Sequence, residues 1–342
     1  MKRFALALLK SLPALLILTA CGSGDQSFTL KGKYKNLQSG DFYVFSTDPS
    51  WQGFDTVHVD EGKFQYSRPI NDTLVLTIQY PNFMQMQVVV APGATTTIKG
   101  DANNLLKTKI GGLEDNERLS VFRLSTVGKS EGEVLQLAED FITQHPASFV
   151  SLALLQKHFL SQPEIDYKRV GRMLDRMVKA TPRRPAVKRL HTEFQALAQC
   201  APGKKLPKFS ALTDAGIRVD NATFRGKHLV IWFWAMWNAE MAYPVAHVRQ
   251  LMKNCNGQLQ ALNVCLDADT ATMHRVMKRD SLTAHIVCDR LEWNSPLVRA
   301  FGVRDVPSAI LVDTAGIVIA RDLNEDELEK KLETIGLKKS NK

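Results

Sequence analysis

The sequence has few cysteines, and their spacing supports neither a C-x-x-C redox site nor a zinc site. Among 342 residues there are five cysteines, and none is part of a C-x-x-C motif. No group of Cys and His has the spacing of zinc ligands, so we expect neither a metal site nor a cofactor. The cysteines after Cys21 allow three disulfide pairings that the sequence does not rank. They are Cys200, Cys255, Cys265 and Cys288.

Beyond its first twenty residues the chain also lacks a long apolar run. Lys2 and Arg3 precede a mostly apolar stretch, Phe4 to Leu18, which polar residues interrupt. The stretch is too short and too interrupted for a membrane span of about 20 residues. It is typical of an export signal, and residues 1–20 are therefore excluded from the predicted fold.

The end of this signal, Leu18-Thr19-Ala20-Cys21, resembles a bacterial lipobox. The resemblance implies that Cys21 receives diacylglycerol and becomes the mature N-terminus. The chain would then be lipid-anchored in the cell envelope, on the periplasmic side or at the outer membrane, with residues 21–27 as a tether. The alternative is an ordinary signal or membrane anchor with a chance cysteine.

The charge balance is basic, but the excess is local. Removal of residues 1–20 takes away three basic residues and lowers the formal net charge from +9 to +6. Nucleic acid is not an expected partner, because the chain is predicted to be exported and no nucleic-acid motif accompanies the charge. The basic cluster is either a solvated helix face or a surface for an acidic partner or anionic lipid. Its members are Lys168, Arg169, Arg172, Arg176, Lys179, Arg183, Arg184, Lys188 and Arg189.

Residues 28–112 read as a β domain. Apolar and polar residues alternate over short runs, such as 28–34 and 57–60, with Gly, Asn and Asp between them. This pattern predicts half-buried antiparallel strands packed as a small β-sandwich. Short motifs resemble an uncharacterised bacterial β domain that brings no known catalytic residue, at 55–57, 61–64, 91–93 and 110–112.

Residues 113–200 change to a helical period and form a predicted connector. One apolar stripe recurs at helical spacing and is expected to face a core. It contains Val170, Met173, Leu174, Met177 and Val178.

Strands and helices alternate in the last third, residues 201–342. The continuous apolar run at 228–234 is typical of a central parallel strand that is covered on both faces. Further strands are expected at 259–266, 285–288, 309–312 and 317–320. The fold class is therefore multidomain, with a β-sandwich, a helical connector and an α/β domain.

This third resembles a thioredoxin-like domain of the TlpA/ResA type, related to the AhpC/TSA group. Four segments carry the resemblance, namely 233–237, 264–267, 302–307 and 313–316. The resemblance implies that Pro307 is the family's cis-proline, which in relatives faces the catalytic pair and offers backbone to a bound peptide.

The thiol pair of that family is missing here. Its relatives use Trp-Cys-x-x-Cys at a helix start, where the helix lowers the first thiol's pKa and the second thiol resolves the mixed disulfide. Counted from Trp237, Asn238 replaces the nucleophile and Met241 the resolving cysteine. Pro244 falls two residues earlier than the family's helix proline, so a local deletion is an alternative at Met241. No catalytic residue is expected, and Cys265 and Cys288 are predicted to be buried as small hydrophobes.

The leading hypothesis is a non-catalytic envelope module that binds a peptide or protein, or assists assembly. Its predicted contact surface is a groove formed by Trp237, Asn238 and Pro307, where backbone could pair with an extended peptide. The alternative is a divergent thiol-disulfide oxidoreductase that uses Cys265, Cys288 or a partner's thiol. A third hypothesis is a structural lipoprotein whose β domain binds glycan or protein.

Overall fold

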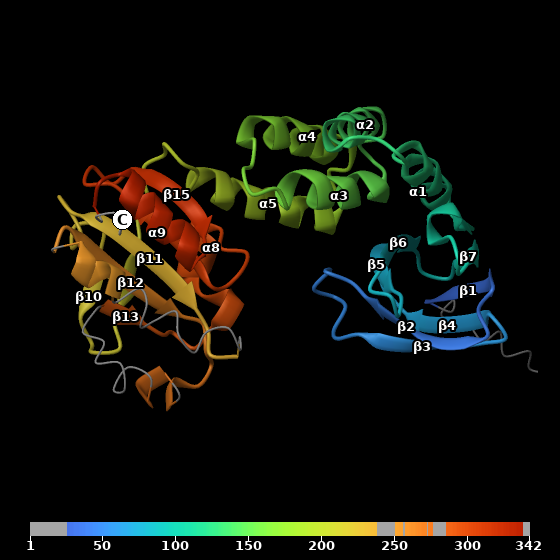
Figure 1. The fold of residues 1–342 in the computed structure, drawn as a ribbon, viewed down its shortest axis with the longest axis horizontal. Helices are drawn as coiled ribbons and strands as arrows, with labels where there is room; N and C mark the ends of the chain where they lie inside the picture. Colours follow the sequence, from blue (N-terminus) through green and yellow to red (C-terminus); the bar gives the residue numbers. More distant parts are fainter. Residues whose placement is uncertain (1–25, 238–249, 256, 272, 276–284, 338–342) are drawn as a thin grey trace, which may run out of the picture. The chain divides into compact units, whose positions relative to one another are not determined.

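The computed structural model describes residues 26–237, 250–255, 257–271, 273–275 and 285–337, and these form two units (Figure 1). The first unit comprises residues up to Ala138 together with Ser148–Leu154, and the second comprises Glu139–Ala147 and the chain from Leu155 onward. The predicted signal peptide and Cys21 lie outside the described residues. Within the described part of the chain, no helix is both long and apolar enough to cross a membrane.

Eight strands of the first unit belong to one hydrogen-bonded sheet, in the order β6-β5-β2-β3-β4-β1-β7-β8. The strands are β1 (Ser27–Lys35), β2 (Ser39–Phe45), β3 (Asp55–Asp60), β4 (Lys63–Pro69), β5 (Leu74–Gln79), β6 (Gln85–Val90), β7 (Thr95–Asp101) and β8 (Lys109–Gly111). A short 3-10 turn, η1 (Leu105–Lys107), precedes β8.

The local sequence accounts for the hairpins in this sheet. In β5 every second residue is buried, which is the period of a strand with one covered face. Between β3 and β4, Glu61 and Gly62 both have positive φ, 46° and 71°. Two such residues make the two-residue turn whose twist suits a hairpin. A Cβ at Gly62 would lie 2.3 Å from the carbonyl oxygen of Tyr34, so only glycine fits there.

The predicted β domain is confirmed, with one difference in the strand directions. The sequence predicted antiparallel strands only, whereas β1 and β7 pair in parallel. The reason is that β6 and β7 are consecutive in the chain but are not neighbours in the sheet. Side chains from all eight strands nevertheless share one apolar core, so the sheet wraps around a single interior.

Helix α1 (Glu114–Ser125) packs against β8 and β6 of this sheet. Its buried Asn116 accepts a hydrogen bond from the Val89 amide at 2.7 Å and donates one to the Val89 carbonyl at 2.8 Å. Thr96 of β7 donates to the same carbonyl at 3.0 Å. The Asn116 amide thus pairs with both backbone polar groups of Val89 in β6, as buried backbone groups require.

The remaining helices of the predicted connector are α2 (Glu131–Gln144), α3 (Phe149–Leu155), the π-helical turn η2 (Gln156–Leu160), α4 (Tyr167–Ala180) and α5 (Pro185–Gln199). The boundary between the two units passes through α2 and α3, so the helical segment is divided between them. In α4 the predicted stripe is buried at Val170, Met173, Leu174 and Met177. Val178 is only half-buried.

The second unit contains a five-stranded sheet in the order β13-β12-β11-β14-β15. Three strands are parallel, namely β11 (His228–Trp234), β12 (Leu259–Cys265) and β13 (His285–Val287). Two are antiparallel to their neighbours, β14 (Ser308–Val312) and β15 (Val318–Leu323). The other elements are the hairpin β9 (Ser210–Leu212) and β10 (Arg218–Asp220), η4 (Glu292–Asn294), α8 (Pro296–Phe301) and α9 (Glu325–Thr334).

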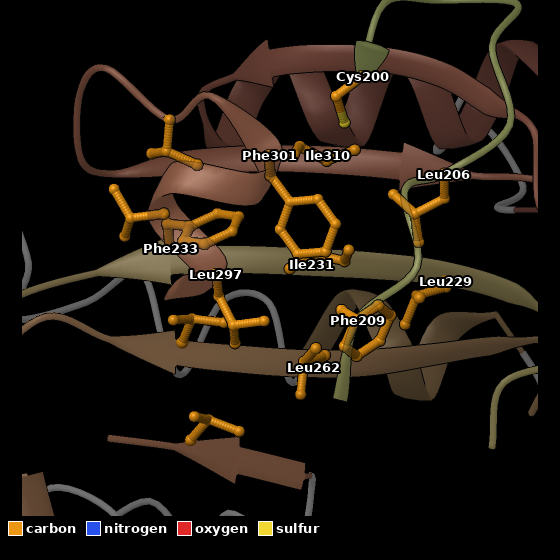
Figure 2. Close-up of a cluster of buried hydrophobic side chains, with 14 of the residues drawn as sticks. Cys200, Leu206, Phe209, Leu229, Ile231, Phe233, Leu262, Leu297, Phe301 and Ile310 are labelled. Carbon is orange, nitrogen blue, oxygen red and sulfur yellow. The ribbon is translucent and has the colours of Figure 1, made fainter. Parts of the chain in front are cut away.

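Both faces of this sheet are covered, as the apolar run of β11 predicted. On one face Phe301 of α8 packs with Ile231 and Ile310, which Figure 2 shows in the core cluster. On the other face Trp232 and Trp234 pack with the apolar residues of α9. The multidomain class with a C-terminal α/β domain is thereby confirmed.

Arg321 of β15 forms hydrogen bonds with the C-terminal end of α5. Its side chain is 3% exposed. It donates hydrogen bonds to the carbonyl oxygens of Leu197 at 3.0 Å, Cys200 at 3.4 Å and Gly302 at 2.8 Å. Since the last carbonyls of a helix have no partner within the helix, a cation at this place satisfies them.

Candidate functional site

The candidate site lies at one edge of the five-stranded sheet. Because β11, β12 and β13 are parallel, their carboxyl ends meet at the same edge, and β14 begins there because it runs the opposite way. Ligands of open α/β sheets bind outside the carboxyl ends of the strands. We call the segments that leave these ends the carboxyl edge; they are 235–237, 266–267, 288–293 and 306–307.

Two of the three predicted groove residues lie on the carboxyl edge. Trp237 follows β11 and is 51% exposed. Pro307 directly precedes Ser308, which is paired with Phe233 near the end of β11. The peptide bond between Val306 and Pro307 is cis, as the resemblance implied. Asn238 and Met241, the positions of the missing thiols, lie outside the described residues.

A buried carboxylate holds the start of the segment that carries Trp237. The amide of Met236 donates to Asp267 at 2.9 Å to Oδ1 and 3.2 Å to Oδ2. Asp267 is 7% exposed. The sequence at 264–267 indicates the end of a strand but not this contact, because the two partners are 31 residues apart along the chain.

The same carboxylate contacts two cysteines. Cys265, the last residue of β12, donates from Sγ to Oδ2 of Asp267 at 3.2 Å. Cys288, which follows β13, donates from Sγ to the backbone oxygen of Asp267 at 3.3 Å. The two thiols are close enough for each to shift the pKa of the other. The sequence did not rank this pair above the other pairings.

The environments of the two thiols differ. The neighbouring Cys288 thiol, and then burial, raises the pKa of the Cys265 thiol. The neighbouring Cys265 thiol lowers the pKa of Cys288, with a further contribution from the backbone amide of Arg290. Cys265 is 2% exposed, as predicted, whereas Cys288 is only partly buried because it lies beyond the last residue of β13.

The other two cysteines lie in apolar surroundings. Cys200 is fully buried, and burial raises the pKa of its thiol to about 11. Cys255 is 1% exposed and belongs to the core on the α9 face. Both resemble small core residues rather than reactive thiols.

Two exposed apolar side chains on the carboxyl edge were not singled out from the sequence. Leu291 is 49% exposed and Trp293 is 42% exposed. Arg290 and Glu292 beside them have positive φ, 62° and 51°, and shape the segment that follows β13. The sequence feature that could have identified them is a pair of apolar residues, Leu291 and Trp293, among polar residues shortly after a strand. With Trp237, the segments of the carboxyl edge thus carry three exposed apolar side chains.

A hollow lies on the surface of the β domain. Its volume is about 450 Å³, and it is lined by Tyr43, Phe45, Ser46, Gly53, Phe54 and Gln79. The rings of Tyr43 and Phe54 meet edge to face at 5.7 Å. Among the residues that the structure describes, no three His, Cys, Asp or Glu side chains are grouped so that they could hold a metal ion.

The comparisons with known proteins agree with this architecture. Residues 201–335 match the Redoxin family model. These residues form a thioredoxin-like domain. Residues 28–119 match a domain of unknown function, DUF4369. That match runs into α1, in keeping with the hydrogen bonds from Asn116 to β6. No curated protein matches the chain.

Several solved structures are similar to the thioredoxin-like domain. The C-terminal domain of a proposed thiol-disulfide oxidoreductase from Bacteroides thetaiotaomicron is 29% identical, and the alignment covers 40% of this chain and 97% of that one with a TM-score of 0.37. A thiol-disulfide oxidoreductase from Bacteroides fragilis is 28% identical, with coverage of 39% and 99% and a TM-score of 0.35. A thiol:disulfide interchange protein from Bacteroides sp. is 18% identical, with coverage of 42% and 95% and a TM-score of 0.36.

Proposed function

We propose that this chain is a lipid-anchored protein of the bacterial cell envelope whose thioredoxin-like domain binds an extended peptide or protein segment at the carboxyl edge. In this proposal the domain does not catalyse thiol-disulfide exchange at positions 238 and 241. The observation that carries the proposal is the exposed apolar surface of the carboxyl edge, set on a backbone that Asp267 holds in place.

The exposed side chains are suited to a peptide partner. Trp237 and Trp293 are about half exposed, so each leaves about 100 Å² for a ligand to cover, given that a tryptophan buries up to about 250 Å². At about 25 cal/mol per Å², covering one of them contributes about 2.5 kcal/mol. Aromatic anchors of this kind dominate the energy of many protein interfaces.

The absence of thiol-disulfide exchange at positions 238 and 241 is proposed from the residues that stand there. A helix start stabilises a thiolate but supplies no nucleophile by itself. Asn238 and Met241 carry no thiol, and no cysteine lies between Cys200 and Cys255. Anchoring is proposed from the lipobox resemblance that ends at Cys21. The envelope location depends on the same segment.

Selection of peptides on the full chain tests the binding proposal. A library of random peptides is selected against the detergent-solubilised protein, and the affinity of the selected peptides is measured by titration. Trp237→Ala should weaken them at least about tenfold, which corresponds to about 1.4 kcal/mol. Trp293→Ala should act in the same direction.

Phe83→Ala is the matched control, because Phe83 is an exposed aromatic residue of the other unit, 81% exposed. It should leave the affinities unchanged. Peptides that bind the wild type, Trp237→Ala and Trp293→Ala equally well would show that the carboxyl edge is not the binding surface.

A further inference from the structure

Two cysteines lie side by side at the carboxyl edge, outside the positions that the family uses. Val264 of β12 is paired with Val287, the last residue of the adjacent parallel strand β13, and Cys265 and Cys288 directly follow this pair. Adjacent strands are about 4.8 Å apart. This spacing falls within the Cα separation of about 4.4–6.8 Å that a disulfide requires.

Both cysteine side chains also point to the same face of the sheet. Val264 and Val287 belong to the core on the α8 face. Because successive side chains of a strand alternate between faces, the next residues turn toward the other face. Cys265 lies in the core on that face, and Cys288 packs against it. Both sulfurs contact Asp267, that of Cys265 at 3.2 Å from Oδ2 and that of Cys288 at 3.3 Å from the backbone oxygen, so the two side chains already meet at one residue.

The contacts assign different roles to the two thiols. Cys288 is partly exposed, and the backbone amide of Arg290 donates to its sulfur. An incoming disulfide can therefore reach it, and its thiolate is stabilised. Cys265 is 2% exposed and has a carboxylate oxygen of Asp267 at 3.2 Å from its sulfur. It is placed to act second, with Asp267 as the acceptor of its proton.

We propose that Cys265 and Cys288 form a reversible disulfide by exchange with a disulfide compound, and that this bond is a redox switch beneath the carboxyl edge. The Cys288 thiolate attacks one sulfur of the compound, whose S–S bond breaks and releases a thiolate that takes a proton from water. Cys265 then passes its proton to Asp267 and attacks the Cys288 sulfur. The second thiolate leaves and takes that proton, so two protein thiols are oxidised while one external disulfide is reduced to two thiols.

Formation of the bond changes the surroundings of Asp267. The carboxylate loses the S–H donor of Cys265, and the backbone oxygen loses that of Cys288. The amide of Met236 remains bonded to the carboxylate at the start of the segment that carries Trp237. An effect of the switch on peptide binding rests on the proposed function, whereas formation of the disulfide does not.

Treatment of the full chain with oxidised glutathione tests the proposal. The folded protein in detergent is exposed to the oxidant, acidified, denatured, alkylated at its remaining thiols and mapped by peptide mass. A cross-linked peptide pair containing Cys265 and Cys288 should predominate, two hydrogen masses below the sum of its parts, and disappear after reduction. Cys200 and Cys255 should be alkylated and serve as internal controls. Free Cys265 and Cys288 in protein that remained folded under the oxidant would overturn the proposal.

Single variants test the order of the two steps. Cys265→Ala should leave Cys288 trapped as a mixed disulfide with glutathione, and Cys288→Ala should leave Cys265 as a free thiol. Cys255→Ala is the matched control and should keep the cross-link. Equal glutathione labelling of Cys265 in Cys288→Ala would overturn the assigned order. Catalytic turnover of a disulfide substrate that depends on Cys288 would support the exchange step but refute the non-catalytic function. A failure of the proposed disulfide and a failure of the proposed function therefore give different results.

Discussion

Replacement of Asp267 tests how the carboxyl edge is held together. In Asp267→Ala the part-buried amide of Met236 loses its acceptor, and the thiol of Cys265 loses one as well. Hydrogen bonds to a charged acceptor contribute about 1.5–3 kcal/mol, and an orphaned buried donor costs about 1–3 kcal/mol. Removal of a carboxylate that is 7% exposed relieves part of its desolvation cost. We therefore expect a net loss of about 2 kcal/mol in the free energy of unfolding of the thioredoxin-like domain.

Urea unfolding followed by tryptophan fluorescence measures this loss. Of the five tryptophans only Trp51 lies outside the C-terminal unit, so the signal reports mainly on that unit. With a urea dependence of about 1–3 kcal/mol per M, the midpoint should fall by about 1 M. Asp267→Asn should lose less, since its amide oxygen can still accept from Met236.

Asp269→Ala is the matched control, because Asp269 is exposed and accepts a hydrogen bond only from the nearby amide of Ala271 among its described contacts. Its midpoint should stay close to that of the wild type. If Asp267→Ala unfolded at the same urea concentration as Asp269→Ala, the carboxylate would not be the anchor of the Met236 segment, and the reasoning would be refuted.

Three further predictions concern redox activity, anchoring and stability. The purified chain should not reduce insulin above the uncatalysed rate, while Asn238→Cys combined with Met241→Cys should produce measurable activity; robust turnover by the wild type would contradict this. Cys21→Ala should remove the lipid from the mature protein and its retention in membranes, and an intact-mass measurement without lipid on the wild type would contradict the anchor. Arg321→Met should lower the free energy of unfolding by about 3 kcal/mol, because three carbonyl oxygens lose a buried cationic donor. Arg321→Lys should recover part of this loss of stability. An unchanged Tm in Arg321→Met would count against the role of this contact.

Local pattern was sufficient for most of the fold. The apolar run at 228–234 predicted a central strand, and every residue of β11 after His228 is buried. The stripe around Met173 predicted the buried face of α4, because helical spacing alone places these residues on one side. The parallel pairing of β1 with β7 was not predictable, since no turn connects these strands and their direction depends on where β7 enters the sheet.

For the candidate site, the sequence by itself determined what is missing: neither Asn238 nor Met241 carries a thiol. It also indicated Trp237 and Pro307, because both belong to motifs that can be read along the chain. Only the tertiary structure decided that Cys265 and Cys288 meet at Asp267, and that the Met236 amide shares the same carboxylate. Contacts between the ends of separate parallel strands depend on strand order and register, and neither is encoded by the residues next to each cysteine.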